Sequence, residues 1–312
     1  MYQPYIRGKQ FELIGIKELI VPVLLNNLGK ISPIIEPVKD SSTFKTTLRE
    51  LAKNNVNFTI IINPQVGSFN DPEKILDLIQ DALSNYNNFQ VGVIFHAKIN
   101  HKGIIDILNK FSNLKCQITL IHNCVFDNIS EIIGMYNQPF VIKFNIVNLK
   151  LTSKRYFRNF AKTTLVELDD YFDAQSRNSD YLSVGESDFS EEHLFYKEEG
   201  FIGFSDYLTI GEEFSESGFL PYAVAIHLSY SDNVNRIKIK HFVSDTNQDT
   251  SDIAGKFEEA LNKLIEWCNI NRYNSISIPF YRQYHTNGHF PGLGTLKKLS
   301  LMNHIDLVLK LI

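Results

Sequence analysis

Short apolar runs alternate with amphipathic runs from residue 31 to residue 145 of the chain. The apolar runs are rich in β-branched residues and too short for helices, so they predict buried strands. The runs between them repeat apolar side chains at three or four positions, which is typical of helices that cover a sheet. The predicted strands are the segments 31–38, 57–64, 89–97, 117–123 and 139–145.

The polar residues that end these strands recur at intervals of roughly 30 residues, the length of a strand–helix unit. A repeat of this kind builds a parallel sheet. The pattern therefore predicts an α/β protein, a (β/α)8 TIM-barrel-like fold that spans residues 1–312 as a single domain.

Later segments complete the predicted barrel. A sixth strand is expected within 163–172, a seventh at 201–211 and an eighth at 222–230, with 236–243 as a hairpin extension of the eighth. Other parts of the chain are expected to be an N-terminal plug and helix (1–30), a lid-like loop after strand six (173–199), a loop at 280–294 and C-terminal helices (252–312).

Composition narrows the range of functions. Hydrophobic residues make up 44% of the 312 residues, which is enough for a large core, and the net charge of −4 gives no general attraction to nucleic acid. The basic cluster 154–158 is interpreted as a solvated helix face. The three cysteines lack metal-site spacing, and no targeting segment or membrane span is apparent. These features predict a cytoplasmic protein.

A polar side chain ends each of the first five predicted strands, and the carboxyl ends of parallel strands meet at one rim. A turn or a helix cap explains any single residue of this kind, but five in succession indicate a polar rim. Histidines and carboxylates there suit acid–base chemistry, and a lysine suits an anion. The candidate catalytic residues are His96, His122, Lys143, Glu167 and Asp169.

Other residues are candidates for ligand binding. Arg7 and Lys9 flank Gly8, so this segment fits either an anion-binding loop or an exposed basic lead-in. Carboxylates of Glu36, Glu167 and Asp169 suit either a divalent metal or a general base, and the sequence indicates no other cofactor. The remaining ligand-binding candidates are Asn63, Arg177, Asp206 and His227.

Several stretches resemble the bacterial branch of the beta-protein family, which is named after a bacteriophage protein. They are MYQPYIRGKQFEL, SPIIEP and the later runs DDYFDAQSRNSDYL, FSEEHLFY, GFSDYLTIG, AVAIHLSY and IKIKHFVSD. The likeness covers most of the chain but includes no catalytic motif. It implies a TIM-barrel-like fold without a characterised activity and a role in antiviral defence, and it assigns no catalytic residue.

Two functions compete at this point. The first is a defence-associated, hydrolase-like activity on a phosphorylated small molecule or nucleotide at the rim. The second is a non-catalytic sensor or scaffold that binds a protein partner in an anti-phage system. Because the chain contains no HExxH, GxSxG, P-loop or GxGxxG motif, the sequence leaves open whether the protein is an enzyme.

Overall fold

The computed structural model describes residues 1–114, 116–136, 141–215 and 220–312. Contacts among these residues divide the chain into two compact units. The first unit consists of Met1–Asp170, Glu192–Tyr207 and Ile312, and the second of Tyr171–Glu191 and Leu208–Leu311. Each unit is therefore assembled from separate stretches of the chain.

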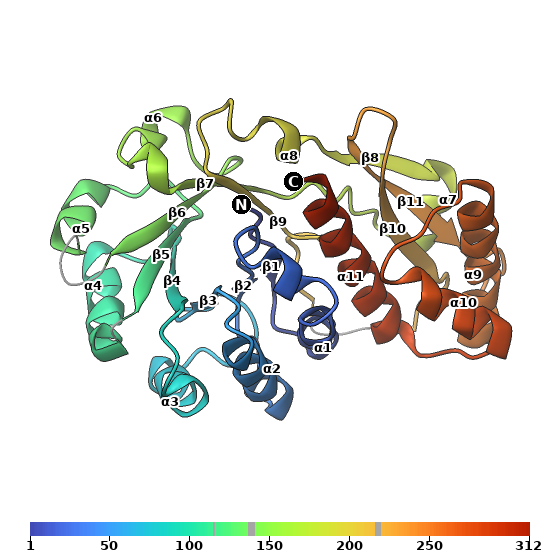
Figure 1. Ribbon diagram of the computed structural model, residues 1–312, viewed down its shortest axis with the longest axis horizontal. Coiled ribbons are helices and arrows are strands. Elements are labelled where there is room, and N and C mark those ends of the chain that lie inside the picture. Colours follow the sequence, from blue (N-terminus) through green and yellow to red (C-terminus); the bar gives the residue numbers. More distant parts are fainter. Residues whose placement is uncertain (115, 137–140, 216–219) are drawn as a thin grey trace. The chain divides into compact units, whose positions relative to one another are not determined.

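A parallel sheet forms the centre of the first unit (Figure 1). Within the described residues it has eight strands in the order β1-β2-β3-β4-β5-β6-β7-β9. Tyr2 bridges both Ile31 and Phe204, which joins the two edges into a nearly closed barrel and confirms the (β/α)8 prediction. The strands are β1 (Tyr5–Ile6), β2 (Ile34–Ile35), β3 (Phe58–Ile61), β4 (Phe89–Phe95), β5 (Gln117–His122), β6 (Ile142–Asn148), β7 (Leu165–Asp169) and β9 (Gly203–Asp206).

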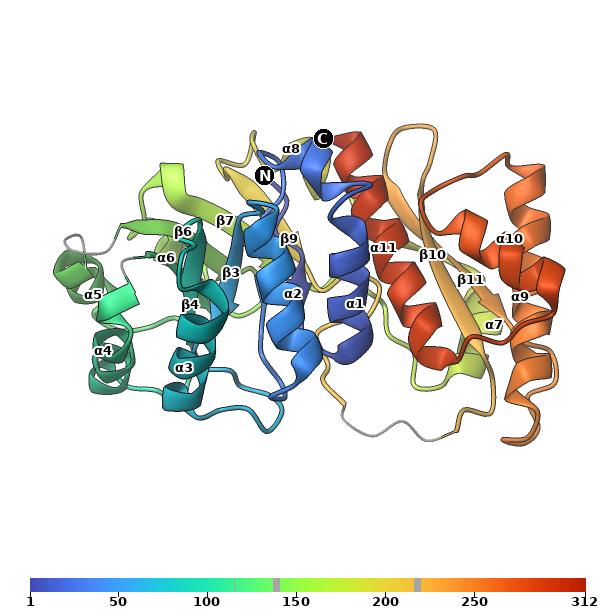
Figure 2. The same ribbon diagram turned by 60° about the horizontal axis from the view of Figure 1, so that its bottom comes forward.

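Helices follow the barrel strands and pack on the outside of the sheet (Figure 2). In α2 the side chains of Phe44, Leu48 and Leu51 are buried, as the helical spacing predicts. Ser41 caps this helix by accepting a hydrogen bond from the backbone N–H of Phe44. The helices are α1 (Gln10–Leu19), α2 (Ser42–Lys53), α3 (Pro72–Leu83), α4 (His101–Lys110), α5 (Ile129–Tyr136), α6 (Lys154–Phe157) and α8 (Glu192–Phe195).

The prediction of an N-terminal plug was wrong, because residues 1–30 provide the first strand and helix of the barrel. The assignment of 222–230 as the eighth barrel strand was also wrong, because this segment is β10 (Ala225–Ser231) of a separate sheet. β1 was missed because its two residues are too few to show a period. Conversely, β10 has the partly exposed pattern of an antiparallel strand with one solvated face.

The second unit contains an antiparallel sheet of three described strands in the order β10-β11-β8. β10 pairs with β11 from Ala225↔Val243 to Ser231↔Ile237, which confirms the predicted hairpin. Asp252 caps α9 by accepting a hydrogen bond from the backbone N–H of Gly255. Besides β10, the elements are α7 (Tyr181–Val184), β8 (Glu186–Ser190), β11 (Ile237–Val243), α9 (Ile253–Ile270), α10 (Ile278–Asn287) and α11 (Leu293–Leu311).

Three further predictions concern two expected loops and the start of one strand. The lid-like loop 173–199 is not a plain loop, since it contains α7, β8 and α8. The tail predicted as a loop at 280–294 begins inside α10, which ends at Gly288 in the left-handed conformation. The expected start of a strand at 139–140 lies outside the described residues. None of the helices in the described ranges has the length and apolar character of a membrane span.

Barrel closure gives the first prediction. A Cβ on Gly203 would lie 2.5 Å from the backbone oxygen of Met1, whereas a Cβ on Gly29 meets nothing within 4 Å. We expect Gly203→Ala to lower the free energy of unfolding by about 1–3 kcal/mol through overpacking, measured by urea denaturation. Gly29→Ala is the matched control, and equal midpoints for the two variants would contradict this account of the closure.

Candidate functional site

Side chains from every strand of the barrel meet in one hydrophobic cluster, and only the barrel interior allows such a meeting. Side chains alternate between the two faces of a strand, so residues two positions apart share a face. A strand residue an even number of positions from a member of this cluster therefore faces the barrel interior, and one an odd number of positions away faces outward. Its buried members are Tyr5, Ile34, Ile61, Ile94, Ile121, Phe144, Ile146, Val166, Leu168 and Tyr207.

A polar residue follows this cluster on the interior face of β1 to β7, at the carboxyl end of the barrel, and after β9 the cluster member Tyr207 takes this place. Parallel barrels place their ligands at this end. We call these positions the mouth ring. They are Arg7, Glu36, Asn63, His96, Asn123, Asn148, Asp170 and Tyr207.

Arg7 and Glu36 form one wall of the mouth. The guanidinium Nη1 of Arg7 lies 2.5 Å from Oε2 of Glu36, and the two side chains are 12% and 0% exposed. The Arg7 guanidinium carbon also lies 5.2 Å from the ring centroids of both Tyr5 and Tyr207. Hydrogen bonds, charge and cation–π contacts therefore hold Arg7 in one place.

The Glu36 carboxylate accepts several hydrogen bonds. The Tyr5 hydroxyl donates to Oε2 at 2.7 Å, and the Gln65 backbone N–H donates to Oε1 at 2.6 Å. Burial, followed by the Glu36 charge, raises the pKa of Tyr5 well above its ordinary value, so this phenol stays a donor. Glu36 therefore fixes the wall in place and is not a proton-transfer group.

His96 and Asn123 form a second wall, on the neighbouring strands β4 and β5. Phe95 pairs with His122, which makes His96 and Asn123 the next pair in register. The N–H of Asn123 still donates to the carbonyl of Phe95 at 2.9 Å, so the strand alternation extends to this residue. Its Oδ1 is buried and has no hydrogen-bond partner within the described residues.

The imidazole of His96 is held in a defined state. The backbone N–H of Lys98 donates to its Nδ1 at 3.3 Å, so the neutral ring carries its proton on Nε2. Burial, followed by the charge of Lys98, lowers the pKa of His96. At neutral pH this residue is therefore suited to donating a hydrogen bond from Nε2.

The polar residues between these walls have structural tasks. The side chain of Asn63 donates to the carbonyl of Ile94 at 2.9 Å and accepts from its N–H at 2.8 Å. The carboxamide of Asn148 accepts from the N–H groups of Lys150 and Leu151, which orders the turn after β6. Neither carboxamide is positioned primarily for a ligand.

Lys150, and not Lys143, is the lysine at the carboxyl ends of β6 and β7. Its Nζ lies 2.9 Å from Asp169 and donates to the carbonyl of Asp170 at 2.7 Å, at the carboxyl ends of β6 and β7. Lys143 lies at the opposite end of β6, because the strand continues to Asn148. The expectation that β6 ends at Asn145 was wrong, and Lys143 does not reach the mouth.

His122 lies on the outer face of β5, one position after interior Ile121. Its Nδ1 is 3.0 Å from the Tyr156 hydroxyl, and the Phe160 ring lies 4.5 Å away. It is fully buried, and burial lowers its pKa to about 3. The expected role of His122 in rim catalysis is therefore not supported by its position.

Three other candidates of the first unit also face away from the barrel interior. Glu167, Asp169 and Asp206 occupy the outer-face register of β7 and β9, and Asp206 accepts from the Tyr2 hydroxyl at 2.9 Å. Arg177 and His227 belong to the second unit. The Nδ1 of His227 there lies 2.8 Å from that of His241.

Of the predicted site residues, Arg7, Glu36, Asn63 and His96 belong to the mouth ring, and Lys9 follows it as the N-cap of α1. Sequence reasoning missed Tyr5, Asn123 and Lys150. The signal for Asn123 was present, because it stands two positions after Ile121 just as His96 stands two positions after Ile94.

The expected metal set is not assembled. Glu36 faces the interior and Glu167 faces outward. The one grouping of potential metal ligands among the described residues is Glu167, Glu192 and Glu199. The residues of the mouth therefore suit polar and anionic ligands.

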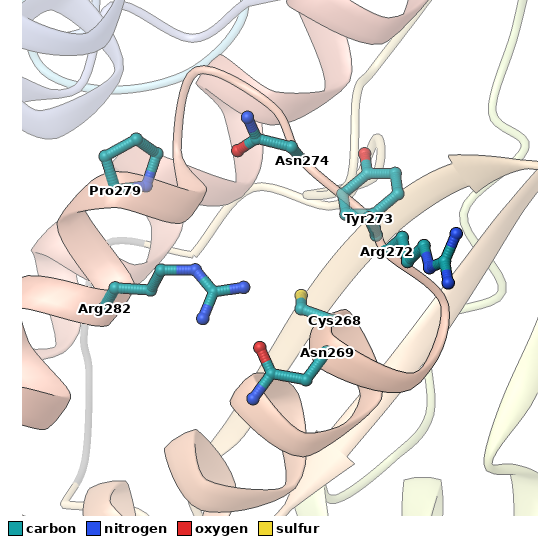
Figure 3. A pocket seen from close by; sticks show the side chains of 7 residues that line it. All are labelled: Cys268, Asn269, Arg272, Tyr273, Asn274, Pro279 and Arg282. Carbon is teal, nitrogen blue, oxygen red and sulfur yellow. The ribbon is translucent and has the colours of Figure 1, made fainter.

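A cavity of about 510 Å³ lies in the second unit. Figure 3 shows the guanidinium of Arg282 directed toward Cys268 and Asn269, whereas that of Arg272 points away. Burial raises the pKa of the Cys268 thiol to about 11, which leaves it protonated and unreactive. One guanidinium and an inert thiol make this cavity a weaker candidate than the mouth ring.

No protein-family model matches this chain, and a search of the curated proteins finds no match.

The buried ion pair gives a stability prediction. Glu36→Gln leaves the Arg7 charge buried without its carboxylate, so we expect a loss of about 3–5 kcal/mol in the free energy of unfolding. Glu73, whose pair with Lys110 is exposed, provides the control Glu73→Gln, with an expected loss below about 1 kcal/mol. Similar losses in urea denaturation would contradict a special role for the wall.

The buried histidine gives a pH prediction. Because the pKa of His122 is lowered to about 3 in the folded chain, the unfolded chain binds its proton first as the pH falls below about 6.5. Stability should fall on acidification by up to about 1.4 kcal/mol per pH unit from this residue. In urea denaturation series at different pH values, we expect His122→Phe to make the dependence of the free energy of unfolding on pH shallower. The control His285→Phe, at an exposed position, should keep the wild-type slope. Parallel slopes for wild type and His122→Phe would refute the assignment.

Proposed function

We propose that the first unit binds a phosphorylated small molecule or nucleotide in the mouth of its barrel and acts on it in a hydrolase-like reaction. The observation that carries this proposal is the pair His96 and Asn123. They are adjacent in register on the interior face, and the Asn123 Oδ1 is a buried acceptor without a partner among the described residues. Such an atom suits a ligand hydroxyl or a positioned water.

The start of α1 supports the phosphate part of the proposal. The helices α2, α3 and α4 are each capped by an acceptor side chain, from Ser41, Asp71 and Asn100. The N-cap residue of α1 is Lys9, whose side chain makes no cap hydrogen bond. A cationic residue at a helix N-terminus adds to the positive end of the helix dipole, which favours an anion, and part of that negative charge comes from the buried Glu12 in the first turn, whose carboxylate accepts from the N–H of Arg7 at 2.7 Å.

The mouth ring supplies groups for hydrolysis. His96 would donate a hydrogen bond from Nε2 to a phosphoryl oxygen, and Asn123 would orient a water through Oδ1. The water attacks phosphorus, the bond from phosphorus to the leaving oxygen breaks, and the water's proton passes to solvent. The leaving oxygen takes a proton from solvent. Arg7, held by Glu36, contributes positive charge to the site.

The alternative function is a sensor or scaffold without catalysis. Its support is the rigidity of the Arg7–Glu36 wall, in which the carboxylate already accepts three hydrogen bonds. The resemblance to a phage-named family supports antiviral defence as the setting for either function. Ligand binding without turnover, together with a protein partner recovered at the mouth, would favour this alternative.

The test compares His96→Gln with the control His101→Gln, at the start of α4, where the partly exposed imidazole lies 3.5 Å from the Glu131 carboxylate. We expect nucleoside monophosphates or inorganic phosphate to raise the thermal midpoint of wild type and His101→Gln, with a smaller shift in His96→Gln. Release of phosphate should fall by about 100-fold or more in His96→Gln alone. The absence of any shift with these compounds in the wild type would refute the proposed ligand class.

A further inference from the structure

Three carboxylates from separate segments converge on the outside of the barrel. Glu167 lies on β7, Glu192 begins α8, and Glu199 lies between α8 and β9. One oxygen of each lies within 4.8 Å of the oxygens of the other two, and exposure increases from buried Glu167 through Glu192 to exposed Glu199. All three residues belong to the first unit. We call them the carboxylate triad.

Glu167 is the unusual member of the triad. It is 0% exposed, and neither of its oxygens receives a hydrogen bond from an amide, hydroxyl, amine or guanidinium in the described chain. Only the neighbouring carboxyl of Glu192 is close enough to share a proton with it. A buried ionised carboxylate costs several kcal/mol unless a cation or hydrogen-bond donors compensate it.

The cationic groups that contact the stretch 196–202 have partners outside the triad. The N-terminal amine of Met1 donates to the Tyr196 hydroxyl at 3.2 Å and to the carbonyl of Ile202 at 3.1 Å. The ammonium of Lys197 lies 5.5 Å from the centroid of the Tyr196 ring. Neither Glu167 nor Glu199 forms an ion pair with a lysine or arginine of the described residues.

We propose that Glu167, Glu192 and Glu199 bind a divalent cation of the Ca²⁺ or Mn²⁺ class. Ca²⁺ takes carboxylate oxygens at about 2.3–2.6 Å, so two oxygens on one ion stand up to about 5 Å apart. The pairwise spacing of the triad lies within this limit. Water would complete the coordination on the exposed side, next to Glu199.

This site has a structural task that is separate from the mouth ring. Glu167 belongs to the stretch 1–170, whereas Glu192 and Glu199 belong to the returning stretch 192–207 that ends in β9. A bound cation would tie the two stretches together where the last strand enters the barrel. The ion thus acts as a clamp on barrel closure and takes no part in the chemistry at the mouth.

The experiment uses the full chain after treatment with EDTA, titrated with Ca²⁺, Mn²⁺ and Mg²⁺. At about one hundred times the dissociation constant, we expect the thermal midpoint to rise by about 5 °C or more. Paramagnetic resonance of added Mn²⁺ should report about one bound ion per chain. This second readout detects binding directly, whatever the stability of a variant.

Glu199→Gln removes the exposed ligand and should weaken the apparent affinity at least tenfold, while Glu198→Gln, at the exposed neighbouring position, should bind as the wild type does. Failure of all three ions to bind at millimolar concentrations would overturn the proposal. Equal binding by Glu199→Gln and wild type would overturn it as well. Since the probes are the ions alone, these outcomes are independent of phosphate binding at the mouth.

Discussion

Pairing between the first residues of the chain and β9 is the constraint on which the barrel depends. The N–H of Gln3 donates to the carbonyl of Phe204 at 2.9 Å, and the N–H of Phe204 donates to the carbonyl of Met1 at 3.0 Å. Without these bonds the sheet would have two open edges, and the interior cluster would be incomplete. The mouth ring exists as a ring only because Tyr207 follows β9 and meets Tyr5 across this closure, with ring centroids 4.9 Å apart.

The same sheet separates two kinds of polar chemistry. On the interior face, Glu36 is satisfied by Tyr5, Arg7 and Gln65 and supports a polar mouth. On the outer face, His122 is enclosed by aromatic rings, and burial raises the pKa of Glu167 to about 9 with Glu192 and Glu199 nearby. Alternation along a strand decides which environment a residue meets, so neighbouring residues can have unrelated roles.

The sequence predicts the strands well but not the faces of their residues. Ile60, Ile61 and Ile62 are all buried because helices cover the sheet and side chains fill its interior. Such a run has no polar alternation that would reveal which face Asn63 takes. His96 and His122 both follow an apolar strand, yet one lies at the mouth and the other under α6. Strand β1, which closes the barrel, was missed because its two residues, Tyr5 and Ile6, are too few to show an alternating pattern. The longer apolar run 222–230 was assigned as a barrel strand in its place.

The divided first unit has a consequence for synthesis on the ribosome. The edge of β1 emerges about 200 residues before its partner β9. At common translation rates this interval is roughly ten to forty seconds. During that time a nascent sheet would expose the hydrogen-bonding groups of both edge strands, which favours misassociation with other chains. Nascent chains that end before residue 203 should therefore depend on chaperones more than completed ones, and slow codons within the 171–191 insertion would lengthen this vulnerable period.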